Sequence, residues 1–569
     1  MISIRKRDAG AVIAAIGIAL ALLLSARTAG AAGAAGAAGA AGAAEEAEEA
    51  EHASLVAVFE DFRDWRDAAW GDGLGRYDAE RVRSNIAALE SLQARLEAMD
   101  ARQWSVPGQV DYLTVRAEMD RQDFILRVTR PWQRDPVFYV SRLLPVAFTE
   151  LPVTGEALSG LQRTLRALPG YLDAARENLD DVSVDYADLA IRSLTLSDGV
   201  ENGYPYRSDP PDGVIGWYED LLQRAEAQPE LEDDIQTALV ALRDFHGWLM
   251  ANRAGMQGEN GVGEEALDWF VQNALLLPYT SAEMAVLSQR ELDRLWAFYA
   301  LEHHRNRDLP ELELADSREE YQARIAGTDR MVRDWLRDEE IISIPDFIPS
   351  DWREMGYNVP WIERATPPNY WEQVQFRDPA PDHLHAVIPG HRFDALMAEN
   401  NGHPIRGQVN FGARWQGWAV YLEEAPLQLG IFEERARTRE LIYLFGIWRA
   451  ARSLGDIYNQ WNDMTSREVA EYWQSLTPLL DPDVARKYAY LRPSPGHGLE
   501  YTIGNIEMFQ LLGERKRQLR DEFVLRDFHD EFMSKGRIPM SLIRYEMTGH
   551  DRDVRRFFTR TPLSVFLAR

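Results

Sequence analysis

Histidines are the side chains of this sequence that most directly suggest chemistry. Three of the eleven, His383, His385 and His391, lie within nine residues of one another, and Asp382 directly precedes them. Neutral imidazole is the commonest metal-ligating side chain, so histidines clustered beside a carboxylate are a candidate metal site. A polar helix cap or a group of surface histidines would give the same pattern. The cluster therefore leaves metal binding and a structural role both open.

The spacing within the cluster places a condition on metal binding. His385 and His391 are six residues apart, and on a regular helix of 3.6 residues per turn they would point away from each other. Pro389 and Gly390 lie between them. Proline removes a backbone donor and clashes with the preceding turn, so we expect a kink or bulge here. Only such a distortion would let the two imidazoles share a metal.

A carboxylate further along the chain could complete the ligand set. Glu423 lies 32 residues after His391, in the largely apolar stretch that begins at Gly417. A carboxylate from a following helix is the third zinc ligand in a large class of zinc peptidases. The alternative is a glutamate on a solvated helix face, which the apolar neighbours do not favour. The sequence has no cysteine, so any metal must be held by nitrogen and oxygen atoms.

Composition excludes several functional classes. The absence of cysteine rules out a disulfide scaffold, a thiol nucleophile and a lipid-anchored lipoprotein. The formal net charge of −29 argues against nucleic-acid binding, which requires a basic surface. Hydrophobic residues make up 46% of the 569 residues, enough for a sizeable core. We interpret the acidic surplus as an aid to solubility rather than as a binding signal.

The N-terminus has the features of an export signal. Three basic residues at positions 5–7 precede an apolar run over residues 11–24, which is short for a membrane span and typical of a signal peptide. We predict a signal peptide over residues 1–31, an Ala/Gly/Glu tether over 32–52, and one helical domain over 53–569. The protein is then exported, periplasmic or extracellular. An uncleaved N-terminal segment is the alternative and the only membrane contact that we expect.

The remaining chain predicts helices that would position these side chains. Within residues 54–70, apolar residues recur at spacings of three and four, as on one face of a helix. Thr280 with Glu283 and Thr465 with Glu468 have the spacing of helix-opening capping boxes. Alternating strand patterns are few and short. We therefore expect a mainly α protein that forms a single large helical unit with few short strands.

Three motifs, taken together, resemble a known family. They are His385-Ala-Val-Ile-Pro-Gly-His391, then Gly417-Trp-Ala-Val-Tyr-Leu-Glu423, then Pro495-Gly-His-Gly-Leu-Glu-Tyr501-Thr-Ile-Gly504. In this order they resemble the bacterial family called domain of unknown function eight-eight-five. That family is mostly helical and is related to gluzincin-type metallopeptidases. The resemblance extends over most of residues 53–569.

The resemblance implies a zinc site and a peptide substrate. By position, His385, His391 and Glu423 match the family's metal ligands. Tyr501 stands where a hydroxyl could stabilise a developing oxyanion, although a tyrosine of the core would look the same in sequence. The implied fold is that of a helical zinc metallopeptidase.

The sequence also departs from the family at motif positions. The family motif begins His-Glu, and that glutamate takes the proton from metal-bound water. Alanine cannot do so, and losing a general base typically costs about 10²–10⁴ in rate. Four further positions differ from the family's pattern. The five departures are Ala386, Arg392, Asp394, Gln460 and His497.

Three functional interpretations follow from these matches and departures. The first is a metallohydrolase whose base comes from Asp382, Asp394, Glu424 or His497. The second is an inert pseudopeptidase that binds peptides without cutting them, and the third is a helical scaffold without a ligand site. We expect the three ligands to converge and the base position to be poorly filled. Arg492 could bind a substrate carboxylate, although a structural ion pair would use the same side chain. The sequence leaves the oligomeric state open.

Overall fold

The computed structural model describes residues 48–71, 74–75, 77–196, 210–363, 367–490 and 495–569. Within these ranges the regular structure is entirely helical, and no described residue lies in a β-strand. The prediction of a mainly α protein is confirmed. The few short strands that we expected do not occur in the described ranges. The predicted signal peptide, and the tether up to residue 47, lie outside them.

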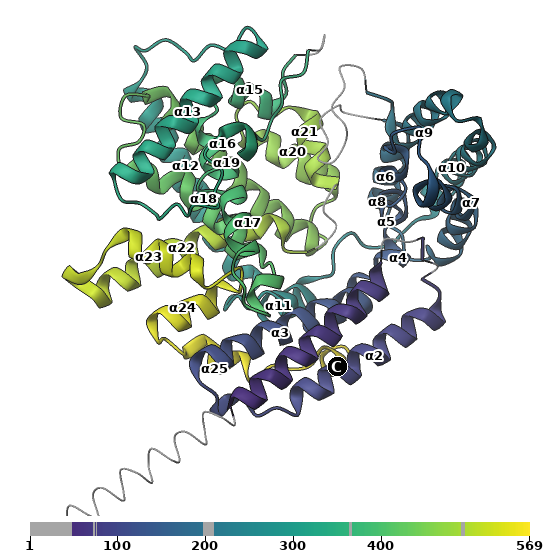
Figure 1. The fold of residues 1–569 in the computed structure, drawn as a ribbon, viewed down its shortest axis with the longest axis horizontal. Coiled ribbons are helices and arrows are strands. Elements are labelled where there is room, and N and C mark those ends of the chain that lie inside the picture. The colour runs from purple at the N-terminus through teal and green to yellow at the C-terminus, as the bar shows by residue number, and fades with distance from the viewer. Residues whose placement is uncertain (1–47, 72–73, 76, 197–209, 364–366, 491–494) are drawn as a thin grey trace, which may run out of the picture.

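The N-terminal helices form one side of the molecule (Figure 1). A helix over residues 48–70 lies beside α2 and α3, and α11 packs on α3. The stripe expected within residues 54–70 is buried in the core, as the exposures of Leu55, Phe59 and Phe62 show. The labelled helices of this group are α2 (Ala79–Glu97), α3 (Val106–Phe124) and α11 (Glu264–Asn273).

The last residues of the predicted tether belong to this folded region. Residues 48–52 are already helical. The Glu48 carboxylate accepts a hydrogen bond from the backbone N–H of Ser105 (2.8 Å), and Glu51 accepts one from the Trp104 indole. Residues 48–52, which we assigned to the tether, are therefore part of the first helix. The low-complexity composition gave no sign that these glutamates belong to the fold, because their partners lie some fifty positions away in the sequence.

Two larger groups of helices stand on opposite sides of the view in Figure 1. The first group is α4 (Pro131–Arg134), α5 (Pro136–Val140), α6 (Leu144–Ala147), α7 (Gly155–Asn178), α8 (Val184–Thr195), α9 (Gly213–Arg224) and α10 (Glu232–Asn252). The second group is α12 (Ser281–Arg305), α13 (Arg318–Asp338), α14 (Trp352–Met355), α15 (Tyr370–Arg377), α16 (Ala380–Ala386), α17 (His391–Glu399), α18 (Gly412–Gln428), α19 (Ala436–Gln460), α20 (Ser466–Leu476) and α21 (Pro482–Tyr490).

The C-terminal helices contact both the second group and the N-terminal helices. They are α22 (His497–Leu519), α23 (Leu525–Ser534), α24 (Met540–Thr548), α25 (Arg552–Phe557) and α26 (Leu563–Phe566). Helix α22 packs against α18 and α19, whereas α24 and α26 contact α3. One hydrophobic cluster runs from Leu55 to Leu563. A core that includes both ends of the described chain makes the molecule a single helical unit.

Local sequence explains where several helices begin. The capping boxes expected at Thr280 with Glu283 and at Thr465 with Glu468 are both formed. In each, the threonine hydroxyl accepts from the glutamate's backbone N–H, and the glutamate side chain accepts from the threonine's backbone N–H. Two donors at the helix start that lack intrahelical partners are thereby satisfied.

Helix α19 is the central element of the second group. Most of its residues are buried, on all of its faces, as is typical of a helix enclosed by others. Beside it, α18 and α22 cross at Gly417 and Gly504. A Cβ on Gly417 would lie 2.4 Å from the backbone carbon of Gly504. The two glycines therefore let these helix backbones approach closely enough to bring their side chains to one cavity.

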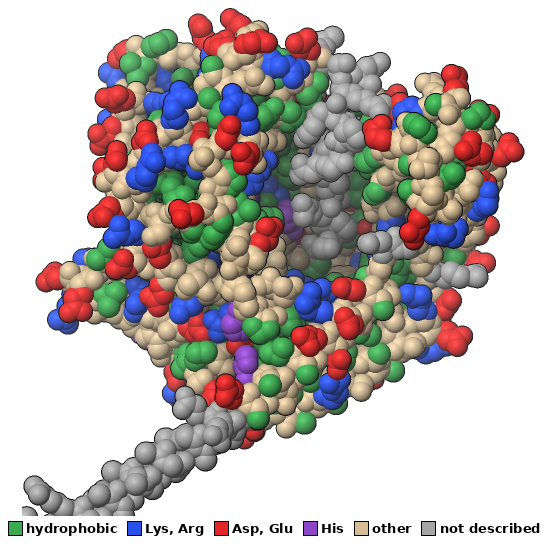
Figure 2. Space-filling model, viewed as in Figure 1, with side chains coloured by type: hydrophobic (Ala, Val, Ile, Leu, Met, Phe, Trp, Pro, Cys, Tyr) green, Lys and Arg blue, Asp and Glu red, His purple; other side chains and the backbone are tan. Residues whose placement is uncertain are grey.

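The surface is acidic but mixed. Figure 2 shows Asp and Glu side chains scattered over this face among Lys and Arg, without a continuous basic patch. This distribution agrees with the formal charge of −29. Among the helices described, none combines the length and the apolar character needed to cross a bilayer.

Candidate functional site

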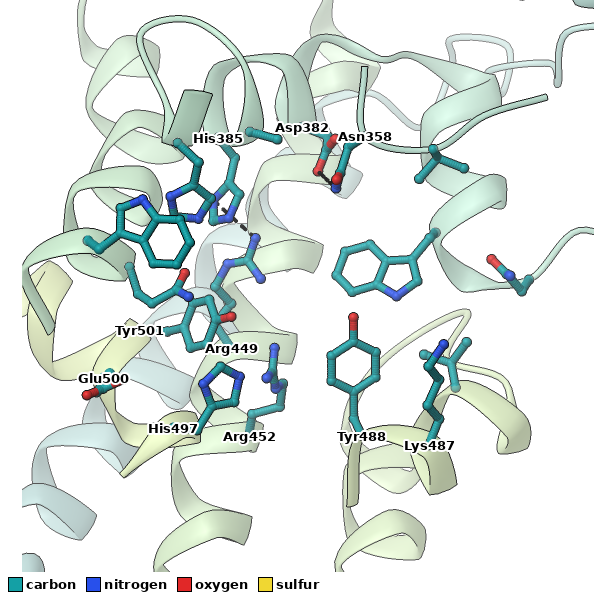
Figure 3. Close-up of a pocket in the computed structure, with 18 of the residues that line it drawn as sticks. Asn358, Asp382, His385, Arg449, Arg452, Lys487, Tyr488, His497, Glu500 and Tyr501 are labelled. Carbon is teal, nitrogen blue, oxygen red and sulfur yellow. Dashed lines mark hydrogen bonds between the residues drawn. The ribbon is translucent and has the colours of Figure 1, made fainter. Parts of the chain in front are cut away.

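A large cavity lies between the helices of the second group, α22 and the end of α3 (Figure 3). Its volume is about 1050 Å³, at the upper end of the usual range for small-molecule sites. Five of the seven predicted site residues line it: Asp382, His385, His391, His497 and Tyr501. Arg492, predicted to bind a substrate carboxylate, lies outside the described residues.

The Pro-Gly pair brings the two histidines together. Helix α16 ends at Ala386 and α17 begins at His391, so the helix is interrupted between them. The imidazole centroids of His385 and His391 lie 4.7 Å apart. A Cβ on Gly390 would lie 2.0 Å from the carbonyl oxygen of His385, which explains the need for glycine. Burial holds the pKa of both imidazoles well below its usual range, so both are neutral at pH 7.

Glu423 reaches the same place, but it is bonded to an arginine. Its Oε1 lies 2.7 Å from Nδ1 of His385. The same oxygen accepts hydrogen bonds from Nε (3.1 Å) and Nη2 (2.5 Å) of Arg449. All three side chains are buried. The cation that Glu423 holds in this structure is therefore a guanidinium.

This arrangement does not fit a zinc ion. Zinc holds nitrogen and oxygen ligands about 2.0–2.2 Å from one point, so the ligand atoms must lie close to one another. Among the described residues, the only group of three His, Cys, Asp or Glu side chains with ligand atoms within 4.8 Å of one another is elsewhere. Nη2 of Arg449 also lies 3.3 Å from Nδ1 of His385. The guanidinium of Arg449 thus lies within hydrogen-bond distance of both Glu423 and His385.

The other group is His52, Asp111 and His403, next to the N-terminal helices. Nε2 of His52 lies 2.9 Å from Asp111, and Nε2 of His403 lies 3.5 Å from the same oxygen. However, Nδ1 of His403 accepts the backbone N–H of Ile405 (3.3 Å) and of Arg406 (3.2 Å). In the neutral imidazole Nε2 must then carry the proton, so it cannot ligate a metal.

Sequence reasoning did not identify Arg449 and Arg452 as site residues, although both line the cavity. They lie one turn apart on α19 and both reach the cavity. Their guanidinium carbons lie 5.2 and 4.7 Å from the ring centroid of Tyr501. Tyr501 is thus held beneath two cations. The available signal was two arginines in an otherwise apolar helical stretch, where charge is costly unless it is used.

Among the proposed bases that are carboxylates, Asp382 is the one that lines the cavity. It accepts a hydrogen bond from Asn358 (3.2 Å), and burial raises its pKa to about 6. Asp394 instead pairs with Arg414 (2.9 Å) behind the cavity wall. Glu424 pairs with both terminal nitrogens of Arg294 at 2.6 Å, so neither is available to a ligand.

The base position itself is an apolar methyl group. Ala386 is buried and lines the cavity next to His385. His497 lines the opposite side, where it begins α22 after Gly496, and its ring centroid lies 5.4 Å from that of Tyr501. The cavity therefore offers cations, aromatic faces and several carboxyl groups, of which Asp382 has a raised pKa, while the residue that follows His385 is an alanine.

Comparison with known proteins agrees with the fold. A structure of a candidate lipoprotein of unknown function from Shewanella oneidensis is similar, with a TM-score of 0.68 at 16% identity over 87% of this chain and 99% of that one. A candidate lipoprotein from Colwellia psychrerythraea has a TM-score of 0.63 at 14% identity over 90% and 99%. No curated protein matches the sequence. The model of the family described as bacterial protein of unknown function (DUF885) matches residues 51–547. The chain belongs to this family.

Proposed function

We propose that the protein binds peptides in this cavity and does not cut them by zinc chemistry. The observation that carries the proposal is Arg449, which bonds to Glu423 and His385 where the family resemblance implies a metal. Ala386 adds to it, because the position where the family resemblance implies the general-base glutamate has no group that can take a proton from water. Removing both the metal and the base leaves a binding cavity.

The lining of the cavity supports a peptide as the ligand. Peptides offer backbone amides, apolar side chains and terminal charges. The cavity offers complementary groups: Gln416 and Asn358 for amides, the rings of Trp371 and Trp415 for apolar side chains, and Arg452 for a carboxylate. A site that combines apolar walls with a few convergent polar groups is typical of ligand binding.

We also propose that binding takes place outside the cytoplasm. The basic residues at positions 5–7 and the apolar run over 11–24 favour export. The two similar structures are of candidate lipoproteins, which are envelope proteins. This sequence has no cysteine to carry a lipid anchor, so the protein would not share their mode of attachment.

Acid–base hydrolysis without a metal is the second candidate function. Asp382 favours it, because a carboxyl group with a pKa of about 6 can take up and release protons near neutral pH. It lies in the same cavity as His385 and His497. If this function holds, hydrolysis of a peptide library should disappear in Asp382→Asn.

Metal content and peptide cleavage test the proposal together. The purified wild type and Ala386→Glu are dialysed against zinc, and zinc is measured by inductively coupled plasma mass spectrometry. A randomised hexapeptide library is then incubated with each and analysed by mass spectrometry. We expect substoichiometric zinc, no cleavage by the wild type, and retention of library members in equilibrium dialysis. Stoichiometric zinc with robust wild-type cleavage would overturn the proposal.

A further inference from the structure

Arg452 is a buried cation without a buried counter-charge. Its residue exposure is 3%, and its guanidinium points into the cavity between Tyr488 and His497 (Figure 3). No described residue forms an ion pair or a hydrogen bond with it. The contacts around its guanidinium are aromatic: the ring centroids of Trp448, Tyr488 and Tyr501 lie 5.5, 4.7 and 4.7 Å from its carbon.

The nearest candidate for a counter-charge is used elsewhere. Asp456 lies one turn further along α19, and its carboxylate accepts the backbone N–H of Gly498 (3.0 Å) and of Leu499 (3.4 Å). It thereby caps the start of α22 and forms no ion pair with Arg452. Glu423 is also engaged, because it forms an ion pair with Arg449. Asp456 and Glu423 are therefore both engaged, while no described carboxylate pairs with Arg452.

A buried charge is costly unless a partner of opposite charge accompanies it. Aromatic faces recover part of that cost by cation–π attraction, but they leave the N–H donors without acceptors. Because the guanidinium opens onto the cavity, a ligand can supply those acceptors. The missing partner is thus expected from the ligand rather than from the protein.

We infer that Arg452 binds a carboxylate of the peptide ligand and so selects peptides by that group. The inference rests on the proposed function and adds the ligand class. A guanidinium presents two parallel N–H groups that match the two oxygens of a carboxylate. The rings of Tyr488 and Tyr501 flank this position, and an environment less polar than water strengthens such a pair. Either the C-terminus of a peptide or an acidic side chain provides the same chemistry.

Equilibrium dialysis with matched peptide libraries tests the inference on the full mature chain. The first library consists of randomised hexapeptides without Asp or Glu and with a free C-terminal carboxylate. The second is identical but C-terminally amidated. The third is amidated and carries one Glu at a fixed position. We expect the wild type to bind the first library about 10- to 100-fold more tightly than the second, as for hydrogen bonds between charged groups. Binding of the third at the strength of the first would identify the side chain as the source.

Three variants separate a specific contact from a general charge effect. Arg452→Met should reduce the preference for the free carboxylate to less than about threefold, and Arg452→Lys should fall between Met and the wild type because it keeps the charge without the fork. Arg121→Met is the matched control. Arg121 lines the same cavity but already pairs with Glu118 (3.3 Å), so its loss should leave the preference intact. Circular dichroism establishes that each variant is folded.

The outcomes distinguish the inference from the proposed function. If the wild type binds the first two libraries equally, or Arg452→Met keeps the full preference, peptide binding stands and the role of Arg452 is refuted. If the wild type binds none of the three libraries, both fail together. If Arg452→Met and Arg121→Met lose the preference for the free carboxylate equally, the preference comes from the overall positive charge of the cavity and not from a bond to Arg452. That outcome would also refute the inference.

Discussion

Two buried arginines in this protein have opposite surroundings. Arg406, at the contact between α3 and the C-terminal helices, is 7% exposed. It donates from Nε to Asp111 (2.7 Å) and from its two terminal nitrogens to Glu546 (2.9 and 2.7 Å). Arg452 is 3% exposed and has aromatic neighbours instead.

The difference indicates what each charge is for. The carboxylates around Arg406 join distant parts of the chain and satisfy its donors, so that arginine works within the folded state. Arg452 faces a cavity with donors that no described side chain satisfies. Burial alone therefore does not separate structural from functional charges, but the location of the counter-charge does. The following four experiments test this distinction.

Removing Arg406 should have the largest effect. Arg406→Met leaves Asp111 and Glu546 buried without their common cation, and breaking such a buried pair costs about 3–5 kcal/mol. Urea unfolding followed by circular dichroism measures the loss. Arg166→Met is a surface control, because Arg166 is largely exposed beside Asp234 and should change the stability by less than about 1 kcal/mol. Equal losses in the two variants would contradict the comparison.

Glu423→Gln should make Arg449 resemble Arg452. The amide oxygen keeps a hydrogen bond to Arg449, but the counter-charge is lost. We expect a loss of about 1–3 kcal/mol in the free energy of unfolding, the usual range for a hydrogen bond to a charged group. The more positive cavity should also bind the free-carboxylate library more tightly. If both the stability and the affinity for the free-carboxylate library fall, then Glu423 does not keep Arg449 from attracting the ligand carboxylate.

Peptide affinity should depend on pH through Asp382, which lines the cavity, and through Asp456, which lies one turn from Arg452 on α19. Burial raises the pKa of Asp382 and of Asp456 to about 6. A peptide C-terminus, with a pKa of about 3.5, stays ionised above pH 5. As the pH rises from 5 to 7, these aspartates lose their protons, and their negative charge opposes the ligand carboxylate. We expect the affinity to fall by about two- to tenfold.

The control for this pH effect is Asp382→Asn, which should flatten the pH dependence in part because Asp456 still titrates. Equilibrium dialysis at several pH values, with constant ionic strength, provides the measurement. An affinity for the free-carboxylate library that increases from pH 5 to pH 7 would refute the assigned direction.

Arg452→Met should have the smallest effect on stability. An apolar side chain of similar length replaces a charge that no described carboxylate compensates, and such replacements are often neutral or stabilising. We expect the free energy of unfolding to stay within about 0.5 kcal/mol of the wild type or to rise. Urea unfolding without peptide measures it beside Arg406→Met. A loss as large as that of Arg406→Met would show that Arg452 has a structural partner.

Local patterns in the sequence predicted much of the helical architecture. The apolar spacing within residues 54–70 and the capping boxes at Thr280 and Thr465 depend on neighbours a few positions away, and they appear in the structure as expected. The family could be identified from three short motifs. The composition of the tether was misleading at residues 48–52, because hydrogen bonds to residues far along the chain hold that part of the helix.

The site was predicted in part, where it depends on residues a few positions apart. Pro389 and Gly390 lie between His385 and His391, so a distortion of the helix was visible in the sequence, and the imidazoles do meet. Glu423 was placed near them through the family resemblance. The sequence did not reveal that Arg449, 26 residues after Glu423, would bond to it. Nor did it reveal that Asp394 and Glu424 would pair with arginines away from the cavity.

Residue types and short spacings suffice to establish the helical class, the absence of thiol chemistry and the missing glutamate at Ala386. Which charges meet depends on the fold. Partners of buried charges come from helices distant in sequence, and Coulomb interactions depend on separation in space and on burial. Because these partners come from distant helices, the fold surrounds Arg406 with carboxylates and leaves Arg452 facing the cavity.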